Sequence, residues 1–223
     1  RDEIKSFLNP SIKNILPNPN NLIDMEKTTQ RTIEAISNGE KVGIFGDYDV
    51  DGATSTALLG NYFSQLGINY EIYIPDRKKE GYGPSINGFK ELIDNNVKVI
   101  FTVDCGTLSF DAINYANKKK IDVIVLDHHQ SEIKLPSAYS IINPNRLDDR
   151  SNLQYLCAAG VSFMFLVSLN RALRLNKWFE KFNVEEPDLI NFLDLVSLGT
   201  VCDVVPLTGL NRAIVKQGLK IIK

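Results

Sequence analysis

IFGDYDVDGATS, residues 44 to 55, places three aspartates at every second position directly behind an apolar run. The spacing D-x-D-x-D-G opens a calcium-binding EF-hand loop, so a calcium site is the first hypothesis. That hypothesis fails because the twelfth position of the loop requires a bidentate glutamate, and this chain has Leu58 there. The residues ahead of the aspartates also favour a short strand over the helix that precedes an EF-hand loop. The three aspartates therefore need another explanation.

Four short apolar runs, rich in β-branched or aromatic residues, are typical of strands in a buried parallel sheet. They lie at 42–45, 70–74, 97–103 and 122–126, and helical periodicity occurs between them at 54–66, 85–95 and 109–119. This alternation predicts an α/β fold, a doubly wound and mostly parallel sheet of about five strands with helices on both faces. Further helices are expected at 23–37, 158–175, 187–198 and 211–222.

Composition narrows the class of protein. The 223 residues, 43% of them hydrophobic, predict one main domain. Three cysteines, far apart and without a C-x-x-C pair, favour a reducing cytoplasm. The N-terminus lacks the layout of a signal peptide, and we expect no membrane partner. The formal net charge of -2 gives no overall attraction for a polyanion, so nucleic acid would have to be held by local charge or by metal.

Acidic side chains gather at one predicted edge of the sheet. Asp47, Asp104 and Asp127 each follow the end of a predicted strand. Because the carboxyl ends of parallel strands open into one crevice, we expect these three acids to meet there together with Asp49 and Asp51. Like charges in one site raise each other's pKa steeply, and divalent cations relieve this repulsion. The alternative for the segment DYDVDG is a solvated turn, since Asp and Gly are common in turns.

The stretch VIVLDHHQ adds the only two histidines of the chain, His128 and His129, behind the last predicted strand. A lone histidine is more often structural, but two in the predicted crevice favour metal or phosphate chemistry. Aspartates with imidazoles form a hard ligand set that suits manganese or magnesium better than zinc. Two such ions ~3.5 to 4 Å apart form the clamp that cleaves phosphoester bonds, so phosphodiester hydrolysis is the leading chemistry.

The segments GDYDVDGATS, VDCGT, LDHHQ and CDVVPL, in this order, resemble the DHH phosphoesterase superfamily. They are most similar to its RecJ branch, the single-stranded-DNA-specific 5′→3′ exonucleases, and RKKEGYGPS, LCAAGVSF and PLTGLNR extend the resemblance. The resemblance implies that Asp49 binds a first metal ion and Asp51 a second, with Asp104 bridging the two. It also implies that His128 and Asp203 complete the second site. Asp203 could not have been selected from its surroundings, because VCDVVP is an ordinary helix-to-loop sequence.

The resemblance further implies a catalytic group of three residues. His129 would contact the scissile phosphate, Asp127 would orient an imidazole from behind, and Asp47 would lie against the ions or their ligands. Arg77 and Arg212 would contact substrate phosphates, with solvated surface as the alternative.

RecJ proteins carry a second, DHH-associated C-terminal domain that grips the nucleic acid, and no such stretch occurs here. We therefore expect a helical lead-in at 1–39, the DHH catalytic domain at 40–208, and at 209–223 the start of a helix leading to a missing C-terminal domain. The implied substrate is single-stranded nucleic acid, DNA before RNA, in cytoplasmic DNA repair and recombination.

Two alternatives remain open. The first is a nanoRNase-like oligoribonuclease, a cyclic-dinucleotide phosphodiesterase or a family II pyrophosphatase, although those relatives carry a histidine where this chain has Phe45. The second is a catalytically silent replication scaffold, although such proteins have lost metal ligands that are all present here.

Overall fold

The computed structural model describes residues 9–222, and at its centre lies a five-stranded sheet with the order β2-β1-β3-β4-β5. The strands are β1 Val42–Gly46, β2 Tyr70–Tyr73, β3 Val99–Val103, β4 Asp122–Leu126 and β5 Ser140–Ile142. Every neighbouring pair is parallel. The strand order reverses at β1, because β2 lies on one side of it and β3 on the other. In parallel sheets of this kind a crevice opens at this switch point, between β1 and β3.

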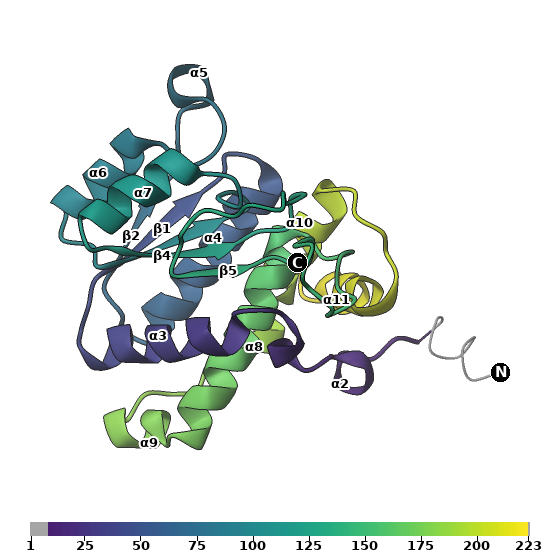
Figure 1. The fold of residues 1–223 in the computed structure, drawn as a ribbon. Helices are drawn as coiled ribbons and strands as arrows, with labels where there is room; N and C mark the ends of the chain where they lie inside the picture. The colour runs from purple at the N-terminus through teal and green to yellow at the C-terminus, as the bar shows by residue number, and fades with distance from the viewer. Residues whose placement is uncertain (1–8, 223) are drawn as a thin grey trace.

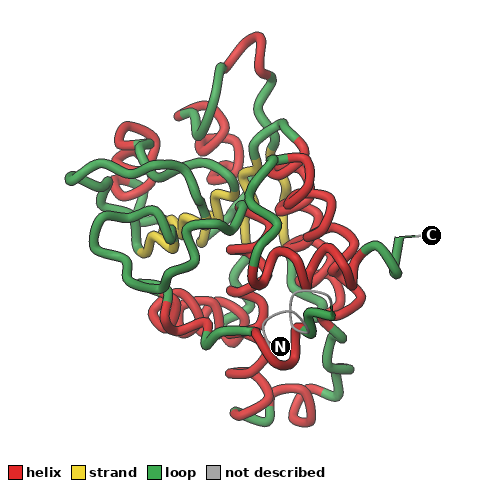
Figure 2. The backbone as a smooth tube through the Cα atoms, turned by 90° about the vertical axis from the view of Figure 1, so that its right-hand side faces the viewer, coloured by secondary structure: helices red, strands yellow, loops and turns green. Residues whose placement is uncertain are grey.

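Helices cover both faces of this sheet, which confirms the predicted doubly wound α/β architecture. The helices are α2 Ile12–Ile15, α3 Met25–Ser37, α4 Val50–Gln65, α5 Arg77–Glu80, α6 Ile86–Asp94, α7 Phe110–Lys118, α8 Ala158–Leu175, α9 Trp178–Phe182, α10 Leu193–Cys202 and α11 Gly209–Gly218, with short 3-10 turns η1 Pro19–Asn21 and η2 Leu189–Phe192. Figure 1 shows α6 and α7 on one side of the strands and α3 and α8 on the other. In Figure 2 the yellow strands lie between red helices, and the turn of α5 projects at the top.

Two apolar cores explain why the strands are continuously hydrophobic. On one face Phe101 packs against Phe63 of α4 and Phe165 of α8, with ring centroids 5.7 and 5.5 Å apart. On the other face Phe45 packs against Phe89 of α6 at 5.6 Å. A sheet that is buried on both sides has no need of polar alternation. Helix α8 is long and apolar enough to cross a membrane by length and composition, but 72% of it is buried inside this fold, as in the core helix of a soluble domain.

The predicted element bounds differ from the observed ones in informative places. Helix α4 begins at Val50 and not at residue 54, because Asp49 is its N-cap and accepts a hydrogen bond from Gly52 N at 2.9 Å. The helix expected at 187–198 is a 3-10 turn followed by α10, which runs on to Cys202. The sequence did not locate β5, which has three residues, nor the short helices α2, α5 and α9. The first eight residues of the expected lead-in lie outside the described part of the chain.

Candidate metal centre

Three predicted site acids form a row along the carboxyl edge of the sheet. The amides of Asp47, Asp104 and Asp127 donate to the last carbonyls of the adjacent strands, on Val103, Leu126 and Ile142, at 3.3, 3.0 and 3.1 Å. The parallel ladder therefore continues one residue beyond the strands and fixes the three backbones side by side. Asp104 has a φ of 60°, a left-handed conformation that few residues other than glycine adopt. All three side chains are buried.

Asp49 and Asp51 enter this row from the first turn of α4. Asp51 is 1% exposed, and its two carboxylate oxygens accept hydrogen bonds from Ala158 N at 2.6 Å and Ala159 N at 2.9 Å. These amides begin α8, so the positive end of that helix dipole faces the carboxylate. Gly52 lets α4 start this close to the strand, because a Cβ there would lie 2.5 Å from Asp47 O.

His128 joins the row to Asp203, the residue that the sequence identified only through the resemblance. His128 Nε2 lies 3.3 Å from Asp104 Oδ1, 3.6 Å from Asp203 Oδ2 and 3.7 Å from Asp51 Oδ2. Asp203 follows the last residue of α10, which packs closely on α4 because Gly199 has no side chain. A Cβ on Gly199 would lie 2.7 Å from Asp51 Oδ1.

His129 stands at the rim of the centre, with 46% of its side chain exposed. Its Nδ1 lies 2.8 Å from Asp127 Oδ1, so the carboxylate orients the imidazole from behind. Burial acts to raise the pKa of Asp127, but hydrogen bonds from His129 and Thr107 outweigh it and hold this pKa well below its usual range. The hydrogen bond to Asp127 in turn raises the pKa of His129. Asp127 therefore stays ionised and holds the ring in one orientation.

The pKa values of four other carboxylates of the centre are raised, in contrast to that of Asp127. Burial, together with repulsion from Asp51 and Asp49, raises the pKa of Asp104 to about 10. Burial is also the main cause that raises the pKa of Asp47, Asp51 and Asp203. This cluster cannot carry all of its charges without a compensating cation.

The donor atoms fit divalent cations. Four buried polar atoms of this centre have no hydrogen-bond partner within the described residues: Asp47 Oδ1, Asp104 Oδ1, His128 Nε2 and Asp203 Oδ2. Ligand atoms lie within 4.8 Å of one another in three sets: Asp47, Asp49 and Asp104; Asp51, His128 and Asp203; and Asp104, His128 and His129. Asp104 and His128 each belong to two of these sets. Carboxylates with few imidazoles suit a hard cation such as magnesium or manganese.

The two predicted phosphate contacts lie in different places. Arg77 is exposed at the start of α5, and its guanidinium lies 5.1 Å from the centroid of the Tyr48 ring, beside the row of acids. Arg212 lies in the first turn of α11, in a separate shallow hollow that Leu207 and Leu219 also line.

Sequence reasoning missed two asparagines that hold the loop carrying both histidines. Asn143 Nδ2 donates to Thr107 Oγ1 at 2.8 Å and to His129 O at 2.9 Å, and Asn145 Nδ2 donates to His128 O. Their signal is the NPN segment at 143–145, a turn sequence that directly follows β5.

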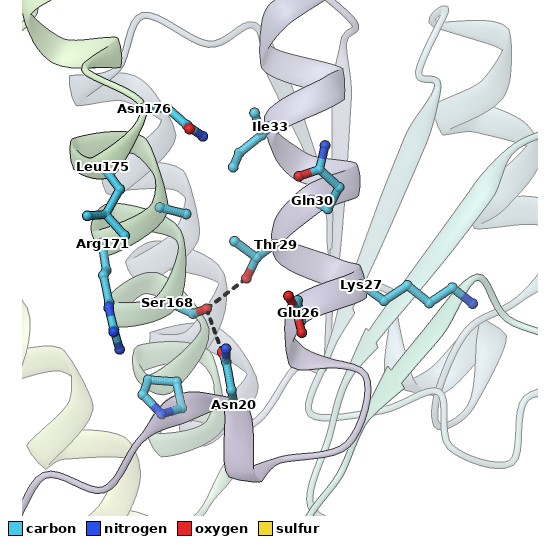
Figure 3. A pocket seen from close by; sticks show the side chains of 12 residues that line it. Asn20, Glu26, Lys27, Thr29, Gln30, Ile33, Ser168, Arg171, Leu175 and Asn176 are labelled. Atoms are coloured by element: carbon cyan, nitrogen blue, oxygen red, sulfur yellow. Dashed lines mark hydrogen bonds between the residues drawn. The ribbon is translucent and has the colours of Figure 1, made fainter.

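A hollow of about 410 Å³ between α3 and α8 lies apart from the metal centre. Figure 3 shows its polar lining, in which Ser168 hydrogen-bonds Thr29 at 2.9 Å and Asn20 at 3.4 Å. None of the acids of the metal centre lines it. The chemistry therefore belongs to the carboxyl edge of the sheet.

Comparison with known proteins agrees with this geometry. A family model described as the DHH family, N-terminal domain, matches residues 41–200. The single-stranded-DNA-specific exonuclease RecJ of Escherichia coli (strain K12) is 38% identical over 217 residues, which are 97% of this chain and 37% of that protein.

Two solved structures are similar to this one. A structure of exonuclease RecJ bound to manganese has a TM-score of 0.75 and 31% identity, and the match covers 89% of this chain and 48% of that one. RecJ from Thermus thermophilus in complex with Mn²⁺ has a TM-score of 0.74 and 28% identity, with 97% and 29% covered. This chain thus spans less than half the length of the relatives that it matches.

Proposed function

The chain belongs to the DHH family, and from this membership and the metal centre we propose that it hydrolyses phosphodiester bonds as a RecJ-like 5′→3′ exonuclease on single-stranded DNA. The observation that carries the proposal is the cluster around His128 Nε2, which oxygens of three carboxylates approach within 3.7 Å. His128 Nε2, Asp104 Oδ1 and Asp203 Oδ2 have no hydrogen-bond partner in the described part of the chain. This chain is also 31% identical to an exonuclease RecJ whose structure was solved with bound manganese.

In this proposal two ions of manganese or magnesium are held by the acids in two overlapping sets. Asp49 and Asp47 would hold one ion, and Asp51, His128 and Asp203 would hold the other. Asp104, whose Oδ1 lies 3.3 Å from His128 Nε2, would serve both. Bound ions of this kind supply an activated water and positive charge against the phosphoryl oxygens.

The protein residues have separate tasks in the reaction. His129 faces solvent at the rim, where it can donate a hydrogen bond to the scissile phosphate while Asp127 holds its other side. Arg77 lies at the same rim and can contact a neighbouring phosphate, and Arg212 is proposed for a more distant one. A further C-terminal domain of a longer protein would grip the strand, in a cytoplasmic role in DNA repair and recombination.

The small-substrate alternative is disfavoured by Phe45, which stands where those relatives carry a histidine. Its ring is fully buried and stacks on Tyr73 at 5.3 Å, beneath α6. In this chain the Phe45 side chain therefore belongs to the apolar core and supplies no metal ligand. The scaffold alternative is disfavoured by the complete set of metal-binding acids.

A degradation assay on single-stranded DNA labelled at the 5′ or the 3′ end tests the proposal. We expect release of mononucleotides from the 5′ end with manganese or magnesium and no release with a chelator. The same oligonucleotide in duplex form and an RNA of the same sequence serve as controls. Preferred cleavage of cyclic dinucleotides or very short RNA would support the small-substrate alternative, and metal binding without any hydrolysis would support the scaffold.

A further inference from the structure

Tyr82, in the segment RKKEGYGPS, contacts the metal centre, although no role was expected for it from the sequence. Its hydroxyl lies 3.1 Å from Asp104 O and at nearly equal distances, 3.1 and 3.3 Å, from the Nδ1 and Nε2 atoms of His129. The two rings meet at 66° with their centroids 5.6 Å apart. The tyrosine therefore spans two loops of the centre, one behind β3 and one behind β4.

The direction of the hydrogen bonds follows from the chemistry of the partners. A backbone carbonyl can only accept, so the Tyr82 hydroxyl donates its proton to Asp104 O. A tyrosine hydroxyl has an ordinary pKa of about 10, so this proton stays in place at neutral pH. The hydroxyl oxygen packs against the His129 ring, 3.1 Å from Nδ1 and 3.3 Å from Nε2, and limits the orientations that the ring can adopt. Asp104 is also the residue with the left-handed backbone.

The backbone conformation around Tyr82 directs its side chain toward the metal centre. Gly81 and Gly83 flank the tyrosine with φ values of 80° and 81°. A Cβ would meet nothing within 4 Å at Gly81 and only an atom 3.7 Å away at Gly83, so their role is conformational and not spatial. Glu80 braces the base of the segment, because its carboxylate accepts from Tyr73 at 2.9 Å and Ser85 at 2.6 Å.

We propose that Tyr82 is a positioning residue, which fixes the imidazole of His129 relative to Asp104 by bridging the two loops. The proposal rests on the proposed phosphodiesterase function for its catalytic consequence. Without the hydroxyl, the Asp127 hydrogen bond still holds one side of the ring, but the side toward Asp104 is free to move. The loss falls on the turnover step and leaves the acids that bind the ions untouched.

Tyr82→Phe tests the proposal, with Tyr115→Phe on α7 as the matched control. The chain has only two histidines, so the ¹⁵N signals of the two imidazole rings can be assigned and followed by NMR with magnesium. We expect Tyr82→Phe to shift the His129 ring signals, to leave the His128 signals like those of the control, and to reduce kcat about 10- to 100-fold with KM and metal affinity nearly unchanged. Gly83→Ala keeps the hydroxyl but strains the backbone that carries it, so this variant should also shift the His129 ring signals.

The outcomes separate this inference from the proposed function. Unchanged His129 signals and a kcat within twofold of wild type in an active enzyme would overturn the positioning role and leave the exonuclease proposal standing. A wild-type protein that cleaves no single-stranded DNA, while Tyr82→Phe still shifts His129, would support the contact and overturn the reaction assigned to the site. A loss of metal affinity in Tyr82→Phe would contradict the inference, because the residue would then support the ligands and not the imidazole.

Discussion

Asp104 Oδ1 and His128 Nε2 lie 3.3 Å apart at the carboxyl edge of the sheet, and neither atom has a hydrogen-bond partner among the described residues. Buried polar atoms are nearly always paired, and an exception needs an explanation. Two ligands of one cation approach each other in this way, since a hard ion in octahedral geometry separates adjacent ligand atoms by ~3 Å. The pair therefore marks the point at which the two ligand sets meet.

Asp104→Ala should remove the paired metal site and not merely weaken it. A carboxylate shared between two cations binds each of them and also lowers their mutual repulsion, so its loss affects both. Calorimetric titration with manganese should show a loss of at least one binding event. Two ions bound at near-normal affinity in this variant would show that another residue bridges them.

His129→Ala should leave both ions bound and reduce the rate. The ring lies at the rim, and Asp127 holds it toward the place where a phosphate would bind. Losing one well-placed electrostatic donor typically costs ~10²- to 10³-fold in rate. The titration and the strand-degradation assay on the same preparation separate the two roles. Complete loss of metal binding in His129→Ala would place this imidazole among the ligands.

The metal-free protein should lose stability as pH rises, and divalent metal should restore it. The pKa of Asp104 is about 10 in the folded chain and ~3.9 when unfolded, so the folded state binds the extra proton between these values. The stabilising contribution of a raised pKa is complete below the unfolded value and declines as pH rises toward the folded one. Thermal unfolding at pH 6 and pH 8.5 should show a lower Tm at the higher pH without metal, and a larger gain in Tm on adding magnesium there.

Asp104→Asn is the matched control for this pH dependence. The amide keeps the size of the side chain and removes the titrating group, so the decline in Tm between pH 6 and pH 8.5 should become smaller. Equal declines in the variant and the wild type would assign the pH dependence to other groups.

The sequence predicted the sheet and the edge at which the acids gather, because both follow from local signals. Continuous apolar runs identify buried parallel strands, and the acids that end them must meet at one edge. The structure shows this convergence directly, because the amides of Asp47, Asp104 and Asp127 each donate to a carbonyl of the neighbouring strand. Strand β5 was not located because three residues carry too little pattern.

Residues that reach the site through tertiary packing could not be predicted from local signals. Asp203 depends on the close approach of α10 to α4, and VCDVVP alone does not indicate it. Tyr82 reaches His129 only because two glycines bend the segment between β2 and α6. In both cases the decisive feature is a glycine whose role becomes visible once the neighbouring element is placed.

Gly199→Ala should weaken metal binding although residue 199 is not a ligand. The added Cβ would lie 2.6 Å from Thr54 Oγ1 and 2.7 Å from Asp51 Oδ1, so α10 must move and carry Asp203 with it. Overpacking of this kind costs typically about 1 to 3 kcal/mol of stability. Gly160→Ala in α8 is the control, because its Cβ would meet only the side chain of Leu156, at 3.2 Å. Chemical denaturation and manganese titration of both variants make the comparison, and equal metal affinity in the two would contradict the packing role.

The 223-residue chain should bind single-stranded DNA weakly and through Arg77. Its formal net charge is -2, and the metal centre is acidic, so electrostatic attraction for a polyanion is confined to the rim. Fluorescence anisotropy with a long labelled oligonucleotide and magnesium should give a dissociation constant no tighter than ~10⁻⁵ M at physiological salt. Arg77→Ala should weaken this binding further, whereas Lys118→Ala, in the last turn of α7, should not. Tight and strongly salt-dependent binding that persists in Arg77→Ala would show that the strand follows a different surface of the domain.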